Sequence, residues 1–184
     1  MSLKTPRSPS APWLWIAVLA VASVALNFKL SCATPFAALA ALAAPNLKRA
    51  DGLALVALAW AANQAVGYLF LGYPHEADSY AWGLAIGVAA LAAFLAADAI
   101  AARLSHPGRP LMMAATLVAS FAVYEAALYA ASAVLPSTDA AFSWTVIGQI
   151  GLVNALVFPG LLLAHKAAVL MGFAPVLPAA SSSR

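Results

Sequence analysis

Charged residues are scarce in this chain of 184 residues. They make up 8% of the sequence against 65% hydrophobic residues, and the mean hydropathy is +0.92. A soluble domain carries roughly 25% charged and about 45–50% apolar residues, so a water-soluble globular protein is excluded. Disorder is excluded as well, because it requires low hydrophobicity. The chain must therefore fold in lipid, and at about 20 residues per membrane-spanning helix its length allows about six spans.

Residues and motifs that commonly carry chemistry are also nearly absent. The single cysteine, Cys32, excludes an internal disulfide and a cluster of several cysteines around a metal ion. Neither His106 nor His165 has a partner at metal-ligand spacing, whereas His75 could serve as a second ligand or as a hydrogen-bond donor to a bound molecule. The sequence contains no Gly-x-Ser-x-Gly motif, phosphate-binding loop or paired-carboxylate motif. An enzyme is therefore not predicted, and uptake driven by ATP would need separate subunits.

Six apolar runs separated by polar turns predict an all-α membrane protein, a compact bundle of six transmembrane helices in one domain. The predicted helices cover about residues 13–28, 33–47, 52–71, 81–102, 111–135 and 142–170, between a head at 1–12 and a tail at 173–184. The first run is also typical of a secretory or lipoprotein signal peptide. Lys29, which breaks the apolar region before the supposed cleavage site, and the hydrophobic segments that follow favour a retained helix.

The second run is too short for an ordinary span. Its dozen apolar positions, from Ala33 to Ala44, reach about 18 Å, whereas the hydrocarbon core is roughly 30 Å thick. Two explanations are open. Either the helix extends through Leu47, or the connection from Asn27 to Pro35 dips into the membrane, where surrounding protein covers its irregular backbone.

Basic residues predict the orientation of the bundle. Only Lys29 falls on one side of the six spans. The other side collects eight of the nine basic residues, which are Lys4, Arg7, Lys48, Arg49, Arg103, Arg109, Lys166 and Arg184. Because positive charge is enriched on the cytoplasmic side of membrane proteins, both termini are predicted to be cytoplasmic.

Aromatic and polar residues gather on the predicted outward face. Three connections form it, at residues 27–35, 72–80 and 136–141, and they combine aromatic side chains with a few polar groups, as small-molecule cavities do. The residues concerned are Cys32, Tyr73, His75 and Tyr80, with Trp82 and Trp144 immediately below. Any one tyrosine or tryptophan could instead belong to an interfacial aromatic belt, and His75 to a solvated turn.

Cys32 has two possible roles. A lone cysteine in an apolar protein is usually a small, inert hydrophobic residue. Here it lies in a polar interruption near Lys29, the only basic residue on the outward side, and a nearby cation favours the thiolate that binds soft metals. One thiolate cannot hold a free metal ion, but it suffices as the single axial ligand to a metal already held in a macrocycle.

Polar groups also lie within the predicted spans, where they are costly and usually mark function or internal pairing. Glu125 lies near the middle of the fifth helix, and amides lie at comparable depth on the third and sixth helices, at Asn63, Gln64, Gln149 and Asn154. Hydrogen bonds between Glu125 and these amides, and a role of Glu125 in substrate binding or coupling, both stay open. Asp98 is expected to be balanced by Arg103 or another basic residue.

Several stretches of the first half resemble a known family. They are Asn27-Phe28-Lys29-Leu30-Ser31-Cys32-Ala33-Thr34-Pro35-Phe36, Trp60-Ala61-Ala62-Asn63-Gln64-Ala65-Val66-Gly67-Tyr68, Gly72-Tyr73-Pro74-His75 and Trp82-Gly83. Together with the span count they resemble the BtuM family, solitary vitamin B12 transporters similar to the substrate-binding S-components of energy-coupling-factor transporters. The second half matches only in its number of spans.

The resemblance implies a function and a site. It implies uptake of cobalamin across the inner membrane of a bacterium, with Cys32 as axial ligand to the corrin cobalt and loss of cyanide from cyanocobalamin as conceivable side chemistry. The residues expected to surround the ligand are Cys32, Phe28, Tyr68, Tyr73, His75, Tyr80, Trp82 and Trp144. A shared energising module is the partner that S-components generally use, whereas solitary members may act alone. Two alternatives remain, a cobalt or nickel ion permease and a non-transporting subunit of a membrane complex.

Overall fold

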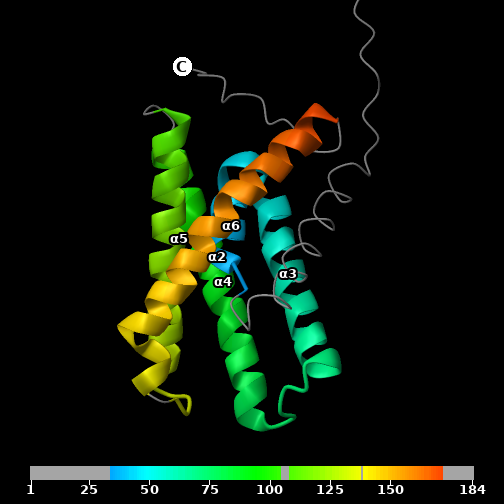
Figure 1. Ribbon diagram of the computed structural model, residues 1–184, viewed down its shortest axis with the longest axis vertical. Coiled ribbons are helices and arrows are strands. Elements are labelled where there is room, and N and C mark those ends of the chain that lie inside the picture. Colours follow the sequence, from blue (N-terminus) through cyan, green and yellow to red (C-terminus); the bar gives the residue numbers. More distant parts are fainter. Residues whose placement is uncertain (1–33, 105–107, 138, 172–184) are drawn as a thin grey trace, which may run out of the picture.

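The computed structural model describes residues 34–104, 108–137 and 139–171, and this part of the chain is entirely helical (Figure 1). Its elements are α2 (Phe36–Asn46), α3 (Arg49–Phe70), α4 (Ala77–Arg103), α5 (Arg109–Ala131), the short 3-10 helix η1 (Asp139–Phe142) and α6 (Trp144–Leu170). The predicted head, first helix and tail, at residues 1–12, 13–28 and 173–184, lie outside the described residues.

Helices α3 to α6 are long and apolar enough to cross a membrane. They contain 22 to 27 residues, and 18-residue windows within them have mean hydropathies of 1.5 to 2.2. At 1.5 Å per residue they are about 33 to 40 Å long, which exceeds the hydrocarbon core of a bilayer. No more than 33% of any of these windows is buried inside the protein, so most of their apolar surface faces outward. The chain is a multi-pass membrane protein, and four of the six predicted spans are seen.

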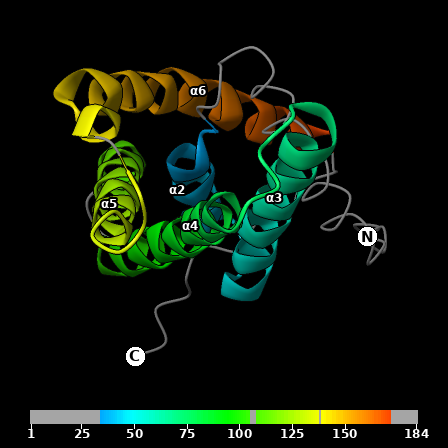
Figure 2. The same ribbon diagram turned by 90° about the horizontal axis from the view of Figure 1, so that it is seen from below.

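Helix α2 is the centre of the bundle and does not span it. It has 11 residues, about 16 Å, and ten of them are buried. Viewed along the bundle, α2 lies in the middle of α3, α4, α5 and α6, and it contacts all four (Figure 2). The predicted span over residues 33–47 is therefore corrected to a half-length helix that begins inside the protein.

Proline explains where α2 begins. Pro35 directly precedes the helix, and a residue before a proline is disfavoured in the α conformation, so the helix cannot extend back through Thr34. At the other end Leu47 is extended and α2 stops at Asn46, which excludes the extension through Leu47. Of the two explanations open for the short second run, the structure supports irregular backbone inside the bundle, at Thr34 and Pro35.

The other helix ends differ from the prediction by no more than four residues. Helix α4 begins four residues early, and Asp78 lies in its first turn, where a negative charge favours the helix N-terminus. Helix α5 ends four residues early, ahead of Pro136, which disfavours helix at the residue before it. Helix α3 begins three residues early, and α6 begins two residues late behind Ser143, whose Oγ accepts a hydrogen bond from the Val146 N–H at 3.4 Å.

The two ends of the bundle differ in charge. One end, the basic end, carries all five basic residues in the described part of the chain, Lys48, Arg49, Arg103, Arg109 and Lys166. The opposite end, the far end, is formed by the connections at residues 71–76 and 132–143 (Figure 1). At the basic end Arg49 Nε lies 3.5 Å from Asp98 Oδ2, which confirms that a basic residue balances this carboxylate.

Candidate functional site

The beginning of α2 is held by polar side chains from the surrounding helices. The N–H of Ala38 donates to Asn154 Oδ1 of α6 at 2.9 Å, and Ser120 Oγ of α5 donates to the carbonyl of Ala37 at 2.9 Å. Thr34 Oγ1 donates to Asn63 Oδ1 of α3 at 2.9 Å. The first N–H groups of a helix have no partner within it, and lipid offers none. Asn154 thus provides an acceptor for one of the first N–H groups of α2, while Asn63 anchors the residue that precedes Pro35.

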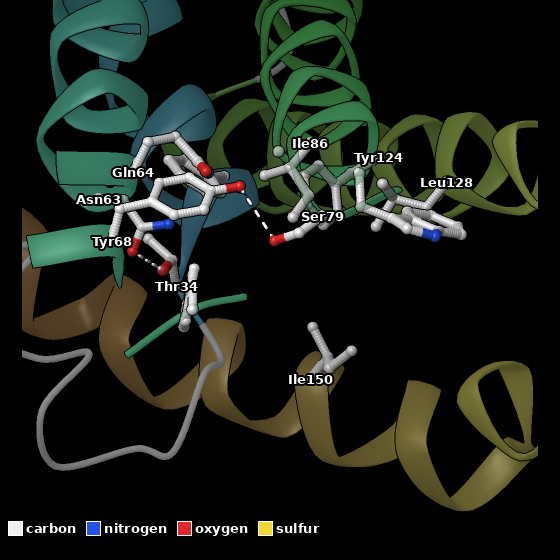
Figure 3. A pocket seen from close by; sticks show the side chains of 13 residues that line it. Thr34, Asn63, Gln64, Tyr68, Ser79, Ile86, Tyr124, Leu128 and Ile150 are labelled. Carbon is white, nitrogen blue, oxygen red and sulfur yellow. Dashed lines mark hydrogen bonds between the residues drawn. The ribbon is translucent and has the colours of Figure 1, made fainter. Parts of the chain in front are cut away.

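A cavity lies beside this helix start, between it and the far end (Figure 3). Its volume of about 430 Å³ is within the range of small-molecule sites, roughly 300–1,000 Å³. All five α-helices and the α3–α4 connection contribute to its lining, which is Thr34, Phe36, Asn63, Gln64, Tyr68, Tyr73, Ser79, Trp82, Gly83, Ile86, Tyr124, Leu128 and Ile150. Among the described residues that line it, none has an acidic or basic side chain. The cavity therefore suits an uncharged group.

Tyr68 is the centre of the aromatic wall. Its ring stacks on Tyr80 with centroids 4.9 Å apart and meets the edge of Tyr73 at 5.7 Å. Its hydroxyl lies 3.1 Å from Ser79 Oγ of α4, a hydrogen bond that joins the two sides of the α3–α4 hairpin (Figure 3). Tyr73 packs directly over Gly67, where any Cβ would collide with the ring. These contacts fix two tyrosine rings against the cavity.

The opposite wall is largely apolar and is closed by Trp82. Its indole Nε1 donates to the carbonyl of Pro136 at 2.8 Å, which ties α4 to the connection after α5. Across the cavity, Ile150 of α6 faces Tyr124 and Leu128 of α5 (Figure 3). Trp82 therefore combines an aromatic surface with a structural tie at the far end.

Gln64 is a polar residue in this lining with a side-chain group that a ligand can use. Its Nε2 is buried and has no hydrogen-bond partner within the described part of the chain. A buried donor without an acceptor costs about 1–3 kcal/mol, and most such groups are satisfied in proteins. Because Gln64 lies one helical turn before Tyr68, its amide and the Tyr68 ring face the same cavity. An oxygen acceptor on a bound molecule would satisfy it.

Glu125 Oε1 is buried and has no hydrogen-bond partner among the residues described, and Glu125 is not in the cavity lining. Of the amides that stayed open as its partners, Asn63 holds Thr34 and Asn154 holds the start of α2. Gln149 is exposed. The amides at this depth therefore serve different purposes.

The structure brings three of the predicted site residues together. Tyr68, Tyr73 and Trp82 line the cavity. Tyr80 lies behind Tyr68, and its hydroxyl is 2.8 Å from Nδ1 of His75 on the exposed surface. Trp144 is 89% exposed at the start of α6 and does not line the cavity. The remaining two, Cys32 and Phe28, lie outside the described residues.

Sequence reasoning left most of the lining unassigned. Gln64 and Tyr68 carry a usable signal, since a polar and an aromatic residue four apart share one face of a helix. Thr34 also carries a signal, because it lies two residues after Cys32, the predicted metal ligand. Phe36, Tyr124 and Ile150 carry no such signal, because an apolar residue in an apolar helix does not reveal whether it faces lipid, core or a cavity.

No protein-family model matches this chain, and neither a curated protein nor a solved structure does. Within residues 34–104, 108–137 and 139–171, no three His, Cys, Asp or Glu side chains are placed to hold a metal ion. The functional argument therefore rests on the cavity and the sequence around it.

Proposed function

We propose that this chain is a membrane uptake protein that binds a cobalamin in the far-end cavity, with the Cys32 thiolate as axial ligand to the corrin cobalt. The observation that carries the proposal is an aromatic cavity inside a membrane bundle, lined by Thr34, two residues after the only cysteine. Since consecutive Cα atoms are about 3.8 Å apart, chain connectivity alone keeps the Cys32 Cα within about 8 Å of the Thr34 Cα.

The chemistry of the lining supports this ligand class. A corrin has a broad face for aromatic contact and a periphery of neutral amide groups. Tyr68, Tyr73 and Trp82 provide aromatic surface, and the unpartnered amide of Gln64 provides a donor for a peripheral carbonyl. A whole cobalamin is larger than 430 Å³, so we propose that one edge of the corrin enters the cavity while the rest extends toward the far end.

The absence of charge in the lining favours a corrinoid over a bare metal ion. Cobalt or nickel ions need imidazole, carboxylate or thiolate ligands, and the described lining has none of these. In a corrinoid the macrocycle already holds the metal, so that a single thiolate completes the coordination. No observation favours the ion permease or the non-transporting subunit over this function.

The proposed direction of transport follows from the charge distribution. If the basic end faces the cytoplasm of a bacterium, as the enrichment of basic residues predicts, the cavity opens toward the outer side of the inner membrane. A cobalamin would then bind from outside. Release to the cytoplasm would use either this chain alone or a separate ATP-hydrolysing module.

Visible spectroscopy tests the ligand. The full chain is purified in detergent with cobalamin present, in wild-type form and as Cys32→Ala, with Ser31→Ala as the matched control. We expect a coloured wild-type protein whose corrin bands are shifted by sulfur ligation, a Ser31→Ala protein with the same spectrum, and loss of the shift in Cys32→Ala. A colourless wild-type protein, or a spectrum unchanged by Cys32→Ala, would overturn the proposal.

A second measurement tests the cavity separately from the cysteine. Tyr68→Ala removes the central ring of the aromatic wall, whereas Tyr129→Ala removes an exposed ring outside it. We expect Tyr68→Ala to weaken cobalamin binding about tenfold, from the loss of roughly 0.5–1.5 kcal/mol of ring contact plus buried area. Tyr129→Ala should leave binding unchanged. Growth of a strain that depends on external cobalamin then tests transport.

A further inference from the structure

A second hollow lies at the basic end, between α5 and α6, and shares no residue with the first. Its volume is about 640 Å³. The two helices are close near Phe121 and Gly151, where a Cβ on the glycine would lie 3.2 Å from the phenylalanine ring. From there α6 crosses the bundle obliquely and diverges from α5 toward the basic end (Figures 1 and 2). The divergence leaves a groove, the α5–α6 groove, open along the membrane face.

The walls of the α5–α6 groove are largely apolar, and the imidazole of His165 also belongs to the lining. Met113 and Leu117 of α5 face Phe158 and Leu162 of α6 along its length. The α5 wall runs over nine residues from Arg109 to Leu117, a rise of about 12 Å, which matches the upper part of an acyl chain rather than a compact solute.

The mouth of the α5–α6 groove is basic. Arg109 and Lys166 line it, and the lining contains no acidic residue. Arg109 Nη2 donates to Asn46 Oδ1 at 2.8 Å, so the guanidinium is held in place, and its fork has further N–H donors. Lys166 is exposed. Neither residue forms an ion pair with a carboxylate among the described residues, whereas Arg49 at the same end does.

We propose that the α5–α6 groove binds an anionic phospholipid of the leaflet at the basic end. Arg109 and Lys166 hold the phosphate of the head group, and an acyl chain lies along Met113, Leu117, Phe158 and Leu162. Basic pockets between transmembrane helices on the cytoplasmic side suit anionic head groups, because the charge adds to a contact that the apolar walls already make with lipid tails. A free phosphate would use only the cations and leave the apolar length of the groove empty. This site is independent of the cobalamin proposal.

Native mass spectrometry of the full chain in detergent, titrated with phosphatidylglycerol or phosphatidylcholine, tests the site. The wild-type protein should bind one phosphatidylglycerol at least several-fold more tightly than phosphatidylcholine. Each basic residue near an anionic lipid surface contributes about fivefold to the binding affinity. Lys166→Gln should therefore weaken phosphatidylglycerol binding about fivefold, and Arg109→Gln/Lys166→Gln should weaken it about 25-fold. Equal affinities for the two lipids, or variants that bind like the wild type, would overturn the proposal.

Matched variants separate this site from general charge and from folding. Arg103→Gln removes a positive charge at the same end but outside the groove and should bind phosphatidylglycerol like the wild type. Ala114→Trp fills the groove with its charges intact and should abolish selective binding, whereas Ala99→Trp, on the exposed face of α4, should not. A wild-type chain without a phosphatidylglycerol adduct, as expected if another segment or a second copy covers the groove, would also overturn the proposal. The thermal unfolding of Lys166→Gln, an exposed position, should be unchanged.

Discussion

At the scale of single residues, two amides deep in the bundle have opposite environments. Asn154 accepts from the N–H of Ala38 and donates to the carbonyl of Ile150, both at 2.9 Å. Gln64 Nε2 is buried with no partner among the described residues. Asn154 accepts a hydrogen bond from a backbone N–H that has no partner within α2. Gln64 carries the desolvation cost of an unused donor, as expected for a group that binds a ligand.

This contrast predicts opposite effects of removing each amide. Gln64→Leu should leave the free energy of unfolding unchanged or raise it by up to about 1 kcal/mol, because it removes an unsatisfied donor. The same substitution should weaken cobalamin binding about three- to tenfold through the lost hydrogen bond. Asn154→Leu should lower the free energy of unfolding by about 1–3 kcal/mol. Denaturant titration in detergent micelles and equilibrium binding measure the two quantities, and a strongly destabilised Gln64→Leu protein would contradict the assignment.

The contact between α3 and α4 at Gly87 requires a residue without a Cβ atom. A Cβ at Gly87 would lie 2.7 Å from Cε2 of Trp60, and the indole cannot move away freely because its Nε1 donates to the carbonyl of Gly83 at 2.8 Å. Gly87→Ala should therefore separate α3 from α4 and lower the free energy of unfolding by about 1–3 kcal/mol.

Gly160 provides the matched control for this substitution. It lies within α6, where an added Cβ meets nothing within 4 Å. Gly160→Ala should leave stability unchanged or raise it by up to about 1 kcal/mol, since alanine is the better helix former. Thermal unfolding in detergent, followed by circular dichroism, compares the two variants, and equal midpoints would refute a close α3–α4 contact at Gly87.

At the scale of elements, α2 is a buried half-helix fixed at both ends. Polar groups of α5 and α6 hold its beginning, and the Arg109 side chain bonds to Asn46 at its last turn. Four longer helices surround it, so alanine is the commonest residue that fits between them. The depth of the cavity follows from this arrangement, because α2 fills the bundle only toward the basic end.

A larger side chain should therefore destabilise the protein more on α2 than on the outer helices. Ala40 is completely buried, whereas Ala155 of α6 is exposed on the outer face. Ala40→Leu should lower the free energy of unfolding by about 1–3 kcal/mol through overpacking. Ala155→Leu should change it by less than about 0.5 kcal/mol. Denaturant titration of both variants tests the central position of α2, and equal effects would argue against it.

At the scale of the whole molecule, the two hollows differ in chemistry as the two ends differ in charge. The far-end cavity has an uncharged lining of aromatic and amide groups, whereas the α5–α6 groove at the basic end has two cations at its mouth. A membrane protein oriented by its basic residues would present the first to the outside and the second to the cytoplasmic leaflet.

The orientation can be tested by labelling cysteines in intact cells. In a Cys32→Ser background, Glu76→Cys places a thiol in the far-end connection and Ser105→Cys places one in the turn between α4 and α5. A thiol reagent that cannot cross the membrane should label Glu76→Cys in intact cells, and Ser105→Cys only after the cells are opened. The reverse pattern would place the cavity on the cytoplasmic side and contradict uptake from outside.

Long apolar runs and sorted charge made much of the architecture predictable. Helices α3 to α6 were expected to within a few residues, because lipid requires about 20 apolar residues per span and polar turns interrupt the runs clearly. The shortness of the second run left two explanations open, and the structure supports irregular backbone near Pro35. The aromatic residues of the α3–α4 hairpin were expected near a site, and Tyr68, Tyr73 and Trp82 do line the cavity. The role of Cys32 stays a prediction.

The sequence by itself determined that this is a membrane protein, where its four long helices lie to within a few residues and which end is basic, because these properties depend only on local composition and length. Tertiary structure alone decided that α2 is the centre of the bundle, that Asn154 binds a backbone N–H at its start while Gln64 faces a cavity, and that α5 and α6 diverge into a basic groove. In a chain so rich in alanine and leucine, every helix face is apolar. Only the packing of the helices therefore distinguishes core, lipid surface and cavity.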